Sequence, residues 1–159
     1  MSRNDEILNK PDSNDIKAYE KLVNKALIAK RKIETGFLEL AESIFEINKT
    51  KLYKVKYRTF AEFCEEDLGF SRQTIYVYIS ILKLITSYSK YFSKDKAVEF
   101  GHKKMRHITE GVNAIDKSKE TDTLKEKKKI ELFSKIKPTM PSTEIEAIIE
   151  DVVSDLENS

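Results

Sequence analysis

Polar side chains between residues 71 and 83 have the chemistry that reads nucleic-acid bases and phosphates. An arginine such as Arg72 can hold guanine through two hydrogen bonds, and a glutamine such as Gln73 can do the same for adenine. Hydroxyl groups contact bases or phosphates, and a lysine reaches the phosphate backbone. We expect Arg72, Gln73 and Tyr76 to make the principal contacts. The full set expected at a DNA interface is Ser71, Arg72, Gln73, Thr74, Tyr76, Val77, Ser80 and Lys83.

A basic stretch lies just before this polar segment. Between Lys49 and Arg58 five of ten residues are basic, whereas the whole chain of 159 residues has a net charge of only +2. A local excess of one sign sets the field near a surface better than the total charge does. We therefore expect Lys54, Lys56 and Arg58 to bind the flanking DNA backbone, with an affinity that falls as salt rises. The alternative is that these cations belong to an ordinary solvent-exposed face of a helix and bind no DNA.

The elements that must position these residues are two helices joined by a tight turn. Thr59 and Glu62 have the spacing of a capping box, which opens a helix by satisfying free backbone N–H groups. Gly69 ends that helix, and Ser71 is a good N-cap for the next one. This order predicts a helix-turn-helix over residues 59–87, whose second helix enters the major groove by its N-terminal turns. Apolar residues expected where the two helices touch are Cys64, Leu68, Phe70, Ile75 and Tyr78.

The rest of the chain predicts an all-α fold. Charged residues make up 35% of it, and only 4 glycines and 3 prolines interrupt it, which favours long helices over a sheet with many turns. Apolar residues recur at helical spacing from Ile16 to Leu52, so we expect long N-terminal helices, with a break at Thr35-Gly36 left open. The residues from Leu52 to Phe60 alternate like a strand but have no partner strand, and we interpret them as an extended link.

The composition divides the chain into four segments. Residues 1–14 are polar and predict a flexible tail, and residues 15–115 predict the helical DNA-binding domain that contains the helix-turn-helix. Residues 116–141 are rich in charged side chains and predict a charged linker, with an exposed helix over residues 116–129 left open as the alternative. Residues 142–159 predict an acidic amphipathic helix, because Ile, Val and Leu recur there at helical spacing among acidic side chains.

The residues that carry enzymatic or metal chemistry are too scattered to form a site. Cys64 is the only cysteine, so it forms no internal disulfide, and we interpret it as a small core residue. His102 and His107 have a poor spacing for metal ligands on one helix face, and the glycines do not cluster into a phosphate-binding loop. We therefore expect no catalytic residue, no metal site, no cofactor and no enzymatic activity.

Export and membrane insertion are not expected either. The N-terminus lacks the apolar segment of a signal peptide, and no apolar run approaches the roughly 20 residues that span a membrane. The expected location is the cytoplasm, and no membrane partner is expected.

Three short motifs in the segment 37–87 resemble a module of bacterial plasmids and phages. They are Leu52-Tyr53 at a helix end, Phe60-x-x-Phe63-Cys64 in the next helix, and Gly69-Phe70-Ser71-Arg72 at the start of the recognition helix. Over its whole length the chain is similar to the plasmid partition proteins, also called chromosome replication/partitioning proteins, most weakly after residue 115. The resemblance implies DNA binding in plasmid partition, replication or copy control, with double-stranded DNA and a partition ATPase as partners.

Two other functions are compatible with the same residues. The chain can be a helical protein-interaction adaptor of a partition or replication complex, without sequence-specific DNA readout, and the helix at 142–159 would then be its binding surface. An RNA-binding regulator is the other alternative. Glu65 lies where many helix-turn-helix units carry a small residue, which weighs against the strictest form of the motif. A homodimer is a further expectation, because DNA readers of this kind often bind two-fold sites as dimers.

Overall fold

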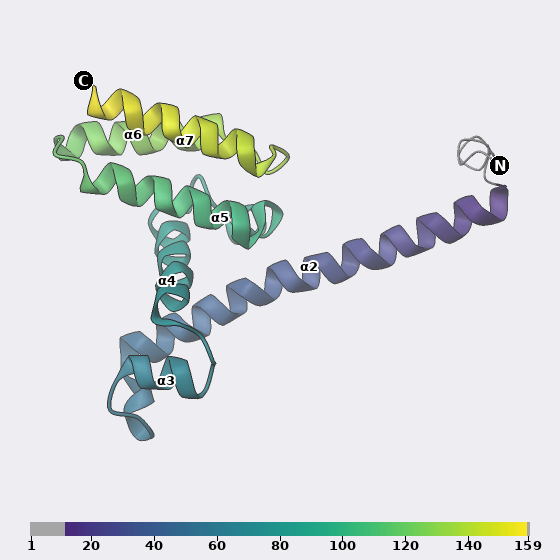
Figure 1. Cartoon of the computed structure of the whole chain (residues 1–159), viewed down its shortest axis with the longest axis horizontal. Helices are drawn as coiled ribbons and strands as arrows, with labels where there is room; N and C mark the ends of the chain where they lie inside the picture. Colours follow the sequence, from purple (N-terminus) through teal and green to yellow (C-terminus); the bar gives the residue numbers. More distant parts are fainter. Residues whose placement is uncertain (1–11, 159) are drawn as a thin grey trace, which may run out of the picture. The chain divides into compact units, whose positions relative to one another are not determined.

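A computed structural model describes residues 12–158, and their regular structure consists of six α-helices and one 3₁₀-helix (Figure 1). These residues contain no strand, so the all-α fold class predicted from the sequence is confirmed. The helices are α2 (Ser13–Thr50), the 3₁₀-helix η1 (Leu52–Val55), α3 (Phe60–Glu66), α4 (Arg72–Ser87), α5 (Lys94–Lys117), α6 (Asp122–Lys135) and α7 (Ser142–Glu157).

The described chain forms two compact units, which divide after Ile33. The first is the N-terminal part of α2, and the second contains the remainder of α2 and the helices that follow it. Most of the expected flexible tail, residues 1–11, lies outside the described residues. The helix begins inside the expected tail, at Ser13, where the Asp12 carboxylate accepts a hydrogen bond of 2.8 Å from the Asp15 N–H.

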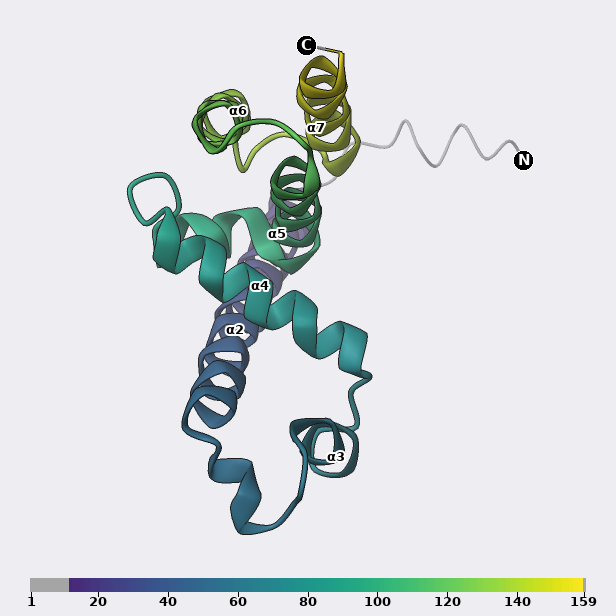
Figure 2. The ribbon, with the colours of Figure 1, turned by 90° about the vertical axis from the view of Figure 1, so that its left-hand side faces the viewer.

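The larger hydrophobic core lies among α5, α6, α7 and the C-terminal half of α4. Helices α5, α6 and α7 run side by side in both views, and α4 crosses α5 (Figure 1, Figure 2). This bundle holds the second half of α4 in place. Its buried residues include Ile81, Leu84, Ile85, Phe92, Met105, Ile108, Ile115, Leu132, Phe133, Ile145 and Leu156.

Helix α6 lies in the segment 116–141, for which the sequence predicted a charged linker. Leu132 and Phe133 of this helix are buried in the larger core. The Phe133 ring packs edge-on against Tyr88 and Phe92, with centroids 5.0 and 4.9 Å away. The segment is therefore a packed helix over most of its length and not a linker. A helix needs few apolar residues to pack, provided that they share one face.

Helix α7 confirms the amphipathic helix predicted at the C-terminus. Its apolar side packs on α5 and α6 of the same chain, where Val152 and Leu156 are buried. Helices α5 and α7 approach closely at Gly111, because a Cβ atom there would lie 2.7 Å from Cγ2 of Ile149. The apolar side of α7 is therefore covered by the chain's own bundle.

Two glycines inside expected helices behave differently. Gly36 lies within α2, so the break that the sequence left open at Thr35-Gly36 does not occur. Gly101 interrupts α5 with a φ of 83° and a ψ of 162°, a conformation that L-residues avoid. The helix resumes at His102, whose backbone N–H donates a hydrogen bond of 3.0 Å to the Glu34 carboxylate.

The segment between α2 and α3, expected as an extended link, is a compact turn. Lys51 adopts a left-handed conformation with a φ of 61°, and η1 follows it directly. The rings of Tyr53 and Tyr57 then pack on Phe60 and Phe63 of α3, with centroids 5.7 and 6.3 Å apart. The prediction of an extended link is wrong because these ring contacts fold the segment back against α3.

Candidate nucleic-acid interface

Three helices form the framework of the candidate interface: the C-terminal part of α2, α3, and the N-terminal half of α4 (Figure 2). Helix α4 therefore packs on two sides, with its first half on this small core and its second half on the bundle. Packing on both sides fixes the direction in which its remaining side faces. The buried residues of the small core are Ile44, Phe63, Cys64, Ile75 and Ile79.

Side-chain caps begin both helices of the predicted helix-turn-helix, as the sequence indicated. The Thr59 hydroxyl accepts the N–H of Glu62 at 3.1 Å, and the Ser71 hydroxyl accepts the N–H of Thr74 at 3.2 Å. The Glu62 carboxylate accepts the N–H of Arg58 at 3.4 Å, one residue before the position that a complete capping box would use. Ser71 thus has a structural role at the start of α4 in addition to the expected contact.

The turn between the two helices depends on Gly69. Its φ of 65° is left-handed, which costs glycine little and other residues more. The next residue, Phe70, donates its backbone N–H to the carbonyl oxygen of Cys64 at 3.1 Å. The Phe70 ring lies 6.0 Å from that of Tyr78, so the turn is tied to α4 by a side-chain contact as well.

The side of α4 that faces neither core carries most of the predicted contact residues. Arg72, Gln73, Tyr76 and Lys83 are exposed, and Ser80 is half-buried. At the helical repeat, residues separated by three or four positions share a face, which aligns these side chains along α4. We call this row of five residues the α4 stripe.

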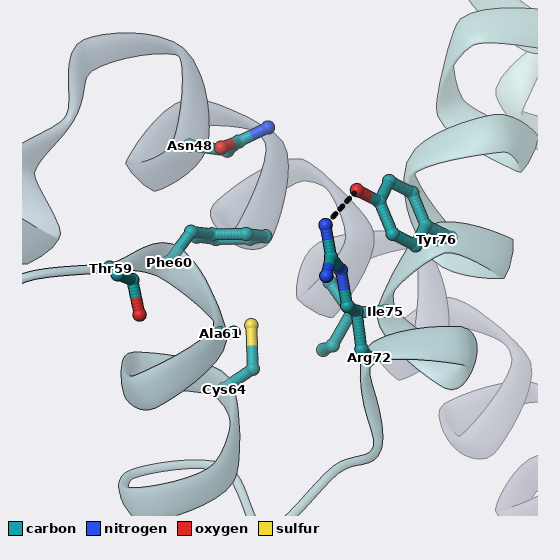
Figure 3. Close-up of a pocket in the computed structure, with 8 residues that line it drawn as sticks. All are labelled: Asn48, Thr59, Phe60, Ala61, Cys64, Arg72, Ile75 and Tyr76. Atoms are coloured by element: carbon teal, nitrogen blue, oxygen red, sulfur yellow. Dashed lines mark hydrogen bonds between the residues drawn. The ribbon is translucent and has the colours of Figure 1, made fainter.

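Arg72 and Tyr76 meet at a hollow of about 340 Å³ between α2, α3 and α4 (Figure 3). The Arg72 guanidinium donates a hydrogen bond of 3.3 Å to the Tyr76 hydroxyl and lies over its ring, 5.6 Å from the centroid. This hydrogen bond raises the pKa of Arg72, which is already a permanent cation. Asn48 and Thr59 line the same hollow, so an amide and a hydroxyl accompany the cation.

Gln73 lines a second hollow of about 200 Å³, which lies between α4 and α5. His102 and Arg106 of α5 line it as well. Thr74 and Val77 are half-buried in the same hollow and therefore lie at the edge of the α4 stripe, facing α5. The structure thus separates these two residues from the exposed ones with which the sequence grouped them.

Ser80 and Lys83 line a third hollow, about 330 Å³ in volume, farther along α4. Asp116 and Lys129 form an ion pair in its wall, with 2.5 Å between the charged atoms. The Lys83 side chain, for which the sequence predicts a phosphate contact, is exposed at this edge.

The basic turn before α3 is tied to the end of that helix. Lys56 lies 3.5 Å from the Asp67 carboxylate, and the Tyr57 hydroxyl donates a hydrogen bond of 2.5 Å to it. The Tyr57 hydrogen bond lowers the pKa of Asp67, so this carboxylate is ionised at neutral pH. Lys54, Lys56 and Arg58 are all exposed, but none of them lines the hollow beside Arg72.

Helix α3 presents an acidic surface to solvent. Glu62, Glu65 and Glu66 are all exposed on it. Glu65 therefore does not lie between the packed helices, and Cys64 occupies the buried position beside it with 1% of its surface exposed. These carboxylates give the exposed side of α3 a negative potential, which repels phosphates and other anions.

Features of other site classes are absent from the described part of the chain. Residues 12–158 contain no group of His, Cys, Asp and Glu side chains arranged to hold a metal ion. No helix among them combines the length and the apolar character that crossing a bilayer requires. Burial raises the pKa of the Cys64 thiol, which lowers its reactivity.

No protein-family model, curated protein or solved structure matches this chain. The resemblance to plasmid partition proteins therefore stays a prediction from the motifs around α3 and α4.

Sequence reasoning missed four residues around the α4 stripe: Asn48 and Thr59 beside Arg72, and His102 and Arg106 beside Gln73. Asn48 could have been found from the sequence, because it is a polar residue at a position where the helical spacing of α2 otherwise places apolar residues. Arg106 could not, since its place beside Gln73 depends on how α5 packs against α4.

Proposed function

We propose that this chain binds double-stranded DNA through the α4 stripe, with α4 as the recognition helix. The observation that carries the proposal is the row formed by Arg72, Gln73, Tyr76, Ser80 and Lys83 on the one side of α4 that faces neither core. A helix with both flanks packed presents such a row rigidly, which suits readout in the major groove.

The chemistry of the row differs along α4 in a way that fits DNA. Its first turns carry Arg72, Gln73 and Tyr76, whose polar groups form hydrogen bonds with base edges in the major groove. Lys83 follows farther along, where a point charge suits a phosphate. The acidic surface of α3 favours one orientation of the protein on DNA, because its carboxylates repel phosphates and disfavour docking through that helix.

The biological role that we propose is plasmid partition or control of plasmid replication. Its support is the resemblance of the motifs around Tyr53, Cys64 and Arg72 to plasmid partition proteins. A partition ATPase is part of that proposal. The adaptor hypothesis relied on the apolar side of α7, which packs on α5 and α6 and so gives that hypothesis no specific support.

The first test is a fluorescence-anisotropy titration of DNA from the region upstream of the chain's own gene, with scrambled DNA of equal length as the control. We expect Arg72→Ala combined with Gln73→Ala to reduce affinity for the true site to that for scrambled DNA. A bidentate contact contributes about 1–3 kcal/mol, so each lost contact costs roughly 5- to 150-fold in affinity.

A matched variant separates this effect from a general loss of polar surface. Thr123→Ala combined with Lys127→Ala removes one polar and one basic residue that are exposed on α6. We expect this pair to leave binding unchanged, and circular dichroism to show equal helicity for both variants. Specific binding that survives the loss of Arg72 and Gln73 would rule out α4 as the recognition helix.

A further inference from the structure

The N-terminal part of α2, before Glu34, carries exposed apolar side chains. Tyr19, Leu22, Leu27 and Ile33 are each more than half exposed, at 70%, 65%, 56% and 64%. Large apolar side chains exposed to this extent are unfavourable in water, and burial against another surface recovers free energy. This stripe of side chains therefore calls for a partner surface.

The spacing of the stripe is that of a coiled coil. Ile16, Tyr19, Val23, Ala26, Lys30 and Ile33 follow one another in steps of three and four residues. This alternation gives a repeat of seven, in which the first and fourth positions of each heptad face a second helix. Ile28 lies on the opposite face of α2, although it is as exposed as the stripe residues at 60%.

We propose that this stripe pairs with the same stripe of a second copy of the chain, as an antiparallel two-stranded coiled coil. The orientation follows from Lys30, the one charged residue among the seam positions. Parallel pairing in register would place Lys30 against Lys30 of the second copy, which brings like charges together in the seam.

Antiparallel pairing removes that repulsion. When Ile16 faces Ile33 of the second copy, Val23 faces Ala26 and Lys30 faces Tyr19. Glu20 then follows directly after the tyrosine, so the Lys30 stem covers the ring while its ammonium group finds an opposite charge. The arrangement is two-fold symmetric, so each complementary pair forms twice.

The area available overlaps the lower end of the range of specific interfaces. The large apolar side chains of the stripe bury about 60–120 Å² each when fully covered. Two helices together then bury roughly 700–1,400 Å², which reaches the lower limit of about 1,200 Å² for specific interfaces. The residues counted are Ile16, Tyr19, Val23 and Ile33 in the seam, where Val23 is half-buried, and Leu22 and Leu27 beside it.

The first experiment measures the mass of the full chain by sedimentation equilibrium, without DNA, over a wide range of protein concentration. We expect a dimer, and we expect Ile33→Asp to raise its dissociation constant at least tenfold because a carboxylate enters the seam. Ile28→Asp, with the same change of side chain at similar exposure, should leave the dimer intact. A monomeric wild-type chain, or an equal effect of both substitutions, would overturn the proposal.

The second experiment tests orientation by disulfide cross-linking in a Cys64→Ala background. A mixture of the Ile16→Cys and Ile33→Cys chains should form a mixed disulfide on oxidation, whereas each chain alone should not. A cross-linked dimer of the Ile33→Cys chain alone would show parallel pairing and refute the antiparallel arrangement.

A membrane surface is the competing occupant, since amphipathic helices with basic polar faces also bind anionic lipid. Co-sedimentation of a monomeric chain with vesicles of phosphatidylglycerol and phosphatidylcholine would favour that occupant and overturn the dimer. None of these three experiments contains DNA, so their outcomes are independent of the proposed DNA binding.

Discussion

At Gly101 the backbone of α5 leaves the helical conformation, and the Glu34 carboxylate caps the helical segment that begins at His102. The φ of 83° belongs to a region that L-residues rarely adopt, and a Cβ atom would lie 3.0 Å from Oε1 of Glu34. The other oxygen of this carboxylate accepts the His102 N–H at the start of the following helical segment. The left-handed conformation therefore favours glycine at this position, and an added Cβ atom would also require the Glu34 carboxylate to shift.

We expect Gly101→Ala to lower the free energy of unfolding by about 1–3 kcal/mol, because the alanine strains the backbone and crowds Glu34. Gly36→Ala is the matched control, since Gly36 lies inside α2 with nothing within 4 Å of an added Cβ atom. It should raise the free energy of unfolding by about 0.5–1 kcal/mol. Urea unfolding of both variants measures the difference, and equal stability of the two would contradict this account of Gly101.

The 3₁₀-helix η1 and the residue after it carry two lysines, Lys54 and Lys56, whose chemistry differs from that of the α4 stripe. Lys54 and Lys56 are exposed point charges, which suit phosphates and carry no sequence information. Lys56 also lies 3.5 Å from Asp67, and this ion pair offsets part of its charge. The two lysines should therefore contribute unequally to DNA binding.

For Lys54→Ala we expect weaker binding to true and scrambled DNA alike. The slope of log affinity against log salt should decrease by about 0.9, the value for one lost phosphate contact. Lys56→Ala should have a smaller effect on the slope, because Asp67 already competes with phosphate for this lysine. Anisotropy titrations at several salt concentrations measure both slopes, with Lys127→Ala as the control. An unchanged slope in the Lys54 variant would remove η1 from the interface.

At the scale of the whole molecule, the two hydrophobic cores both lie within the unit that begins at Glu34. They share α4, so neither core can lose its packing without exposing a side of that helix. This sharing makes the unit a single cooperative structure. Among the described residues, the earliest in the chain that belongs to either core is Phe37.

A fragment of residues 30–159 should therefore fold without the preceding residues. We expect a single unfolding transition and a free energy of unfolding within about 1 kcal/mol of that of the full chain, measured at low protein concentration. Keeping residues 30–33 preserves a helical turn before Glu34. Urea titration followed by circular dichroism is the measurement. Loss of cooperative unfolding would show that the N-terminal residues support the cores.

The sequence by itself determined the helical class, the caps at Thr59 and Ser71, and the left-handed turn at Gly69. Each of these rests on contacts between residues a few positions apart, which spacing and side-chain type reveal directly. The polar residues of the α4 stripe were visible for the same reason, because a helix repeats every few residues.

Only the tertiary structure decided which of those residues remain exposed and what surrounds them. Thr74 and Val77 face α5, and Arg106 lies beside Gln73, because α5 crosses α4 at that point. Helix α6, whose sequence is mostly charged, packs because a few apolar residues meet the rings of Tyr88 and Phe92. Such contacts join residues far apart in the chain, and no local pattern encodes them.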